Sequence, residues 1–147
     1  MVFTVTGNTY YERALMLDAG PLISLYSPND ARKDSIRLYL TSLSNEKYPI
    51  CITYPTIAEV HRRLLFDLGR LVSTQFVNDS LDGSLNIVNI CQADHAQSRD
   101  IINRFTDQNI SFTDASTMAV MKRLGIIKVL SYDFHFYLLN FEVINLQ

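Results

Sequence analysis

Four acidic side chains in this 147-residue chain stand at positions where carboxylates can do chemistry. Asp18 and Asp133 each follow a short apolar run, whereas Glu59 and Asp114 lie near the beginning of helix-like segments. If these like charges came close together they would repel one another, and some of their pKa values would rise unless a cation neutralised them. Clusters of carboxylate oxygens are typical of sites for hard divalent ions such as Mg²⁺ and Mn²⁺.

Each of these acids also has a purely structural explanation. Asp18 opens an Asp-Ala-Gly-Pro sequence that suits a turn, and the helix dipole favours Glu59 near a helix start. Asp114 can satisfy free backbone N–H groups, and Asp133 can cap a short helix after it. The four are far apart in the sequence, so a shared site requires a fold that brings them to one edge.

Short apolar segments alternate along the chain with longer segments of helical period. We expect strands at Ala14–Leu17, Pro49–Ile52, Ser84–Ile90, Ile126–Ser131 and Phe141–Leu146. Helices are expected at Ala31–Ser44, Pro55–Leu68, Leu71–Leu81, Gln92–Phe105 and from Thr113 or Asp114 to Gly125. There is no repeat, low-complexity tract or linker, so residues 1–147 are expected to form a single domain.

This alternation predicts the α/β class. Strands rich in Ile, Leu and Val on both faces, separated by helices, favour a three-layer α/β/α sandwich around a mostly parallel sheet of about five strands. In such a sheet, functional groups gather at the carboxyl ends of the strands, near the switch point in strand order. All four acids are expected in that layer.

Composition indicates an ordinary globular protein, with 48% hydrophobic and 19% charged residues. Neither a membrane-spanning stretch of ~20 apolar residues nor a secretory signal is recognisable. Cys51 and Cys91 lie in apolar runs and are expected to be buried free thiols, which favours a reducing, cytoplasmic setting. A net charge of −2 gives no global basic field that would indicate nucleic-acid binding.

Several other classes of enzyme are disfavoured by missing motifs. The five glycines form neither a dinucleotide-binding fingerprint nor a P-loop, and no Gly-x-Ser-x-Gly elbow is present. Phosphoryl transfer by an aspartate nucleophile would require Asp-x-Asp after the first strand, where this chain has Asp18-Ala-Gly20. A phosphorylatable receiver domain has no place for an acid at the Asp114 helix start.

Four segments carry a resemblance to a known family: "LMLDAGPLISLY", "TIAEVHRRL", "SFTDASTMAVMKRLGI" and "LSYDFHF". In order and spacing they resemble the PIN-domain family, in particular the VapC-like toxin ribonucleases, from Ala14 to the C-terminus. The resemblance implies a Mg²⁺- or Mn²⁺-dependent endoribonuclease that hydrolyses RNA phosphodiester bonds. It also implies a small antitoxin protein as partner and a possible homodimer.

The resemblance further implies roles for the four acids. Asp18, Asp114 and Asp133 would hold one or two divalent ions, and Glu59 would bind metal or position the attacking water. For RNA contact, the candidates are basic and aromatic residues near these segments: Arg62, Arg63, Lys122 and Arg123, and for stacking Tyr26, Tyr54 and Tyr132. His135 follows Asp133 by two residues, so it either approaches the site or has a structural role.

Two departures from the family pattern leave an alternative open. Gly20 stands where the family often has Ser, Thr or Asn, so a hydroxyl or amide near the metal is missing unless Ser116 supplies it. Residues 1–13 form an N-terminal extension that could add a strand or contact a partner. The alternative function is a non-catalytic PIN-like protein that binds nucleic acid or regulates.

Overall fold

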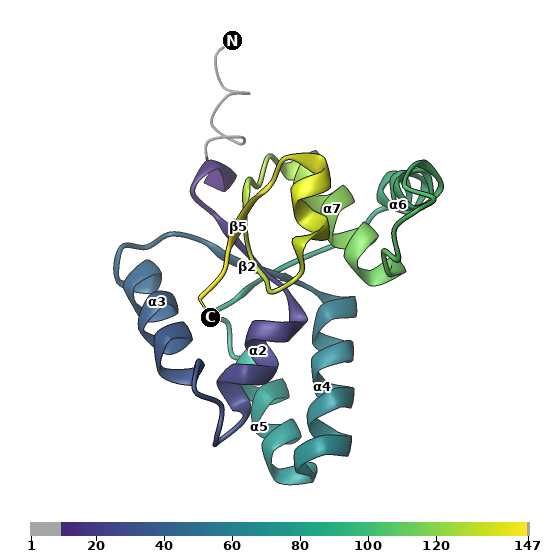
Figure 1. Ribbon diagram of the computed structural model, residues 1–147. Helices are drawn as coiled ribbons and strands as arrows, with labels where there is room; N and C mark the ends of the chain where they lie inside the picture. The colour runs from purple at the N-terminus through teal and green to yellow at the C-terminus, as the bar shows by residue number, and fades with distance from the viewer. Residues whose placement is uncertain (1–9, 147) are drawn as a thin grey trace.

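A parallel five-stranded sheet lies at the centre of the computed structural model, which describes residues 10–146 (Figure 1). Its strands are β1 (Leu15–Leu17), β2 (Ile50–Thr53), β3 (Asn86–Val88), β4 (Lys128–Leu130) and β5 (Glu142–Ile144). They lie in the order β3-β2-β1-β4-β5, and all four pairings are parallel. The five expected strands and the parallel sheet are therefore confirmed. The possible extra strand within residues 1–13 falls mostly outside the described residues.

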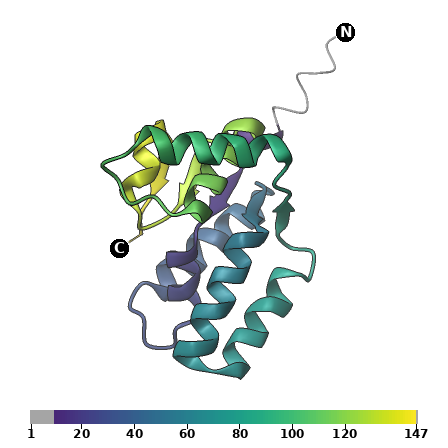
Figure 2. The ribbon, with the colours of Figure 1, turned by 90° about the vertical axis from the view of Figure 1, so that its right-hand side faces the viewer.

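Helices cover both faces of this sheet, which confirms the α/β/α sandwich. On one face lie α2 (Ala19–Tyr26), α3 (Lys33–Asn45), α4 (Tyr54–Leu68) and α5 (Arg70–Ser80). The other face carries α6 (Gln92–Arg104), α7 (Phe112–Leu124) and the 3₁₀ helix η1 (Phe134–Leu139). Figure 2 shows α6 above the sheet and the α2–α5 layer below it.

Helix α2 was not expected, because the sequence after Asp18 has the composition of a turn. Gly20 and Pro21 occupy the second and third positions of the helix. The N–H groups of a first helical turn have no partner within the helix, so a proline there costs little. The apolar residues that follow pack against the sheet and hold the segment helical.

Alternate residues of the buried strands serve the two layers. The side chain of Met16 packs on the α6–α7 side, whereas its neighbours Leu15 and Leu17 pack on the α2–α5 side. This alternation is the two-residue period of a strand that is covered on both faces. It explains why the first strand reads as a continuous apolar run.

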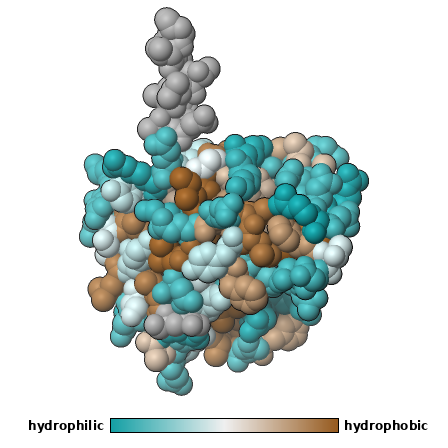
Figure 3. All heavy atoms as spheres, turned by 45° about the horizontal axis from the view of Figure 1, so that its top comes forward, coloured by the Kyte–Doolittle hydropathy of each residue, from teal (hydrophilic) through white to brown (hydrophobic). Residues whose placement is uncertain are grey.

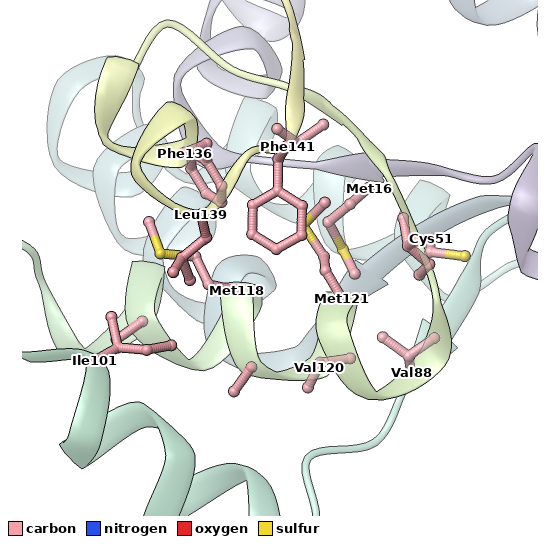
Figure 4. Packing of buried hydrophobic residues seen from close by; sticks show 14 of the residues in the cluster. Met16, Cys51, Val88, Ile101, Met118, Val120, Met121, Phe136, Leu139 and Phe141 are labelled. Atoms are coloured by element: carbon pink, nitrogen blue, oxygen red, sulfur yellow. The ribbon is translucent and has the colours of Figure 1, made fainter.

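Helix α7 is the most deeply buried helix of the described chain, since every residue from Ala115 to Met121 is buried. In Figure 4, Phe136, Leu139 and Phe141 lie over Met118 and Met121. The helix ends at Gly125, whose φ of 78° is a left-handed conformation that glycine adopts at low cost. Its N-terminal end is thereby held in a fixed place beside the sheet.

Two further expectations concern cysteines and membranes. Both cysteines are free; Cys51 is buried as expected, but Cys91 is exposed at the start of α6, so its predicted burial was wrong. Within residues 10–146, no helix is long and apolar enough to cross a membrane.

An ion pair between α6 and α7 uses one of the residues proposed for RNA contact. Asp94 is 2% exposed, and the guanidinium Nη2 of Arg123 lies 2.9 Å from its Oδ2. Arg123 also donates to the carbonyl of Asn89. Burial raises the pKa of Asp94, but hydrogen bonds from Arg123 and from the Cys91 backbone outweigh it, so the pKa lies below its usual value. Arg123 is therefore a structural residue that links two helices.

Replacing Arg123 with Met is expected to lower the free energy of unfolding by about 2 kcal/mol, because Asp94 would remain buried without its cation. Urea denaturation measures the change. Arg99→Met, which removes an exposed arginine from α6, is the matched control and should change stability by less than about 0.5 kcal/mol. Equal effects of the two substitutions would show that the Arg123–Asp94 pair does not join the helices.

Candidate functional site

The four predicted acids lie together in one pocket at the carboxyl edge of the sheet. Its volume is about 520 Å³. Its lining consists of the four acids and five neighbouring residues: Asp18, Glu59, Asp114 and Asp133, with Ala19, Gly20, Ser111, Tyr132 and Phe134. The pocket lies where strand order switches, because β1 and β4 are neighbours in the sheet but distant in the sequence.

Asp18 is the most deeply placed of the four, at 7% exposure directly after β1. Its backbone N–H donates to the carbonyl of Leu130 in the neighbouring strand, at 3.1 Å. Although Asp18 is the N-cap residue of α2, its side chain makes no capping hydrogen bond. The carboxylate instead accepts a hydrogen bond of 2.6 Å from the hydroxyl of Ser131. A turn or capping role therefore does not account for this residue.

Ser131 is a site residue that the sequence analysis missed. Its hydroxyl donates to Asp18 and accepts from the backbone N–H of Asp133 at 2.8 Å, so it links two of the acids. Ser116, the residue considered for a hydroxyl contact, does not line the pocket; it is buried beside Ser98. The position of Ser131, two residues before Asp133 at the end of an expected strand, was the available signal.

Asp133 has a structural role as well as a place in the pocket. It caps η1 by accepting from the backbone N–H of His135 at 2.9 Å. The ring Nδ1 of His135 also lies 2.9 Å from the same carboxylate oxygen, although it makes no well-directed hydrogen bond among the described residues. His135 is therefore a neighbour of Asp133 and is not part of the pocket lining.

The other two acids reach the pocket from helices. Asp114 is the third residue of α7, one residue after the expected start of that helix, and Ser111 supplies the cap by accepting from the Asp114 N–H at 3.0 Å. The Asp114 carboxylate is therefore not needed as the cap. Glu59 lies in the second turn of α4, further along the helix than expected, because Thr53 caps the helix and Tyr54 begins it.

Burial and mutual repulsion raise the pKa values of three of these acids. Burial is the main cause for Asp114, assisted by the charges of Asp18 and Asp133, and its pKa rises to about 8. Burial also raises the pKa of Asp18, against the hydrogen bond from Ser131, and raises that of Glu59 together with the Asp18 charge. For Asp133, burial is outweighed by hydrogen bonds from His135 and Asp114, and the pKa is lowered.

The chemistry of these donors fits a hard divalent ion, since such ions prefer carboxylate oxygens. Without a cation, the raised pKa shows that Asp114 carries a proton at neutral pH. Across residues 10–146, no three His, Cys, Asp or Glu side chains already stand at the spacing of a metal site. A proton on Asp114 allows its carboxyl to lie beside Asp133 instead of pointing at a shared ion, which is the physical reason for that spacing.

Gly20 leaves room for an aromatic ring at the pocket wall. A Cβ on Gly20 would lie 2.9 Å from Cδ2 of Tyr132, closer than side chains normally pack. The guanidinium carbon of Arg32 lies 4.4 Å from the centre of the same ring, and the Tyr132 hydroxyl donates to Ser24 at 2.9 Å. The ring thus fills the space where a residue larger than glycine would project.

The three tyrosines considered for base stacking have different positions. Tyr132 lines the pocket but is held by Gly20 and Arg32. Tyr26 lies elsewhere: it donates to Asp79 and packs against Phe76 in the α2–α5 layer. Tyr54 is 71% exposed at the start of α4 and does not line the pocket.

Gly20→Ala is expected to lower the free energy of unfolding by about 1–3 kcal/mol, because the new methyl group must displace the Tyr132 ring. In the double variant Gly20→Ala, Tyr132→Ala the methyl group has room. The double variant should therefore lose less stability than the sum of the two single variants. Chemical denaturation of all four proteins gives this coupling, and strictly additive losses would contradict the steric pairing of residues 20 and 132.

Solved structures share this fold at low sequence identity. Mycobacterium tuberculosis VapC20, described as a sarcin-ricin loop cleaving toxin, matches with a TM-score of 0.75 and 20% identity, over 86% of this chain and 95% of that one. VapBC2 from Rickettsia felis, bound to a DNA fragment from its promoter, matches with a TM-score of 0.68 and 17% identity, over 91% and 99%. FitAcB from Neisseria gonorrhoeae matches at 0.66 and 18%, over 89% and 96%.

Comparison with curated proteins found no match. A family model described as the PIN domain matches residues 15–142, which contain the whole sheet and all four acids of the pocket. This match covers most of the chain, and the fold agrees with it. The chain therefore belongs to the PIN domain family.

Proposed function

We propose that this protein is a Mg²⁺- or Mn²⁺-dependent endoribonuclease and the toxin of a toxin–antitoxin pair. The observation that carries the proposal is the meeting of four carboxylates in one pocket at the switch point of a PIN-family sheet. Membership of the family and the fold shared with VapC20, a toxin that cleaves the sarcin-ricin loop, support the choice of RNA as substrate.

Asp18, Asp114 and Asp133 are the residues proposed to hold the ion. When bound, a divalent cation supplies a water of lowered pKa and stabilises negative charge on a phosphate. Ser131 fixes the orientation of Asp18 through its 2.6 Å hydrogen bond. Asp114 must give up its proton before it can coordinate, since its pKa is raised to about 8.

Glu59 is proposed to orient the attacking water and accept its proton. It is the most exposed of the four acids, on the α4 side of the pocket. Partial burial and the Asp18 charge raise its pKa, which makes the carboxylate a better base than a free glutamate. Hydrolysis in this scheme needs no side-chain nucleophile.

A small antitoxin is the proposed partner, in a cytoplasmic setting. The support comes from solved structures with the same fold, which include VapBC2 and a toxin–antitoxin complex from Klebsiella pneumoniae. Large apolar side chains at the junction of α4 and α5, namely Phe66 (74% exposed) and Leu71 (86% exposed), offer a surface for a partner. A homodimer remains a proposal of the same kind.

Asp114→Asn is expected to keep the fold and to reduce RNA cleavage in Mn²⁺ by more than about 100-fold, because loss of an ion ligand should cost at least as much as loss of a supporting residue. Cleavage of a mixed pool of structured RNAs measures the effect. The wild type in chelator should also be inactive. In melting experiments, Mn²⁺ should stabilise the wild type, since an ion that binds only the folded protein raises its stability.

Asp107→Asn is the matched control, because Asp107 is exposed in the loop before α7 and takes no part in the pocket. It should cleave like the wild type. Full activity of Asp114→Asn would remove Asp114 from the mechanism. Metal binding without any cleavage by the wild type would favour the alternative, a non-catalytic PIN-like protein that binds nucleic acid or regulates.

A further inference from the structure

A second groove lies beside the acidic pocket, between α6, α7 and η1. Its volume is about 540 Å³, and seven residues line it: Gln97, Arg104, Phe105, Lys122, Leu138, Leu139 and Asn140. The lining contains two cations and no carboxylate. In Figure 1, α6 and the yellow η1 lie on either side of α7. We call this hollow the basic groove.

The two cations of the basic groove are available to a ligand. In the described part of the chain, neither Arg104 nor Lys122 forms an ion pair with an acid, whereas Arg123, the next residue, is committed to Asp94. Both are exposed, and each lies over an aromatic ring that supports its side chain. The Arg104 guanidinium carbon is 4.7 Å from the ring centre of Phe105, and the Lys122 ammonium is 5.0 Å from that of Phe141.

Two elements connect the basic groove with the acidic pocket. Phe134 at the first residue of η1 lines the pocket, and Leu139 at its last residue lines the groove. At about 2 Å per residue, η1 spans roughly 10 Å between them. Along α7, Asp114 lines the pocket and Lys122 the groove, eight residues apart, or roughly 12 Å.

We propose that the basic groove binds the backbone phosphates of a single-stranded RNA segment whose neighbouring phosphate lies in the acidic pocket. This inference rests on the proposed function. Phosphate charge complements Arg104 and Lys122, and counterion release makes such contacts favourable without reading sequence. Phe134, 65% exposed at the start of η1, presents an aromatic ring between the two sites on which a base can stack.

This division of charge has a chemical reason. The pocket itself holds four acids and repels a polyanion unless an ion is bound, so affinity for RNA must come from elsewhere on the surface. The protein has a net charge of −2 and no general attraction for nucleic acid. A pair of cations without acidic partners, close to the pocket, supplies the attraction locally.

The test compares RNA binding by the wild type with that by the double variant Arg104→Ala, Lys122→Ala. Fluorescence anisotropy with a labelled single-stranded RNA of about 12 nucleotides, in chelator, measures affinity in the absence of metal-dependent cleavage. The variant should bind about tenfold or more weakly at low salt. Its log–log salt slope should be smaller by about 1.4, since each lost phosphate contact on a single strand removes about 0.7.

Lys33→Ala, Arg37→Ala is the matched control, because it removes two cations from α3 on the opposite face of the sheet. It should change neither the affinity nor the salt slope. A groove variant that binds RNA with the affinity and slope of the wild type would overturn the inference, even if the wild type cleaves RNA. Equal affinity of the wild type for RNA and for a polyglutamate peptide would also overturn it, in favour of an acidic protein partner.

The outcome is separable from that of the proposed function. If the wild type fails to cut RNA in Mn²⁺ but loses RNA affinity when Arg104 and Lys122 are replaced, the groove is supported and the ribonuclease proposal fails. Melting temperatures of both double variants show whether each remains folded. The charge-reversing variant Lys122→Glu should weaken RNA binding more than Lys122→Ala, which a merely structural role would not produce.

Discussion

Repulsion among four carboxylates in one small pocket is the constraint that the rest of the structure must satisfy. The sheet brings Asp18 and Asp133 together because β1 and β4 pair side by side, and α7 adds Asp114 from a rigid, buried helix. The hydroxyl of Ser131 offsets part of the cost by donating to Asp18 and accepting from the Asp133 backbone. What remains uncompensated appears as the raised pKa of Asp114, and a proton or a cation can neutralise it.

Much of this arrangement could be predicted from the sequence, since the strands are compact apolar runs and the acids follow them at characteristic points. Local sequence misled where tertiary contacts decide the outcome. Gly20 and Pro21 read as a turn, yet they start α2 because the apolar residues behind them pack on the sheet. Ser131 became recognisable as a site residue only once the pairing of β4 with β1 placed its hydroxyl beside Asp18.

Charge is sorted by position in this protein. Its net charge is close to zero, but the acids gather in the pocket and two cations without acidic partners line the neighbouring groove. Lys122 and Arg123 are adjacent in the sequence and have opposite uses: one is free for a ligand, whereas the other is consumed by the buried Asp94. Composition alone cannot make this distinction, because it depends on which face of α7 meets α6.

The central claim is that a divalent ion replaces a proton in the acidic pocket. Calorimetric titration of Mn²⁺ near neutral pH, in buffers of different ionisation enthalpy, counts the protons released on binding. Because the pKa of Asp114 is raised to about 8, its carboxyl is protonated at that pH, and about one proton per ion should leave. The affinity should also rise as the pH approaches 8. Absence of Mn²⁺ binding, or binding that releases no proton and is unchanged in Asp114→Asn, would contradict this account.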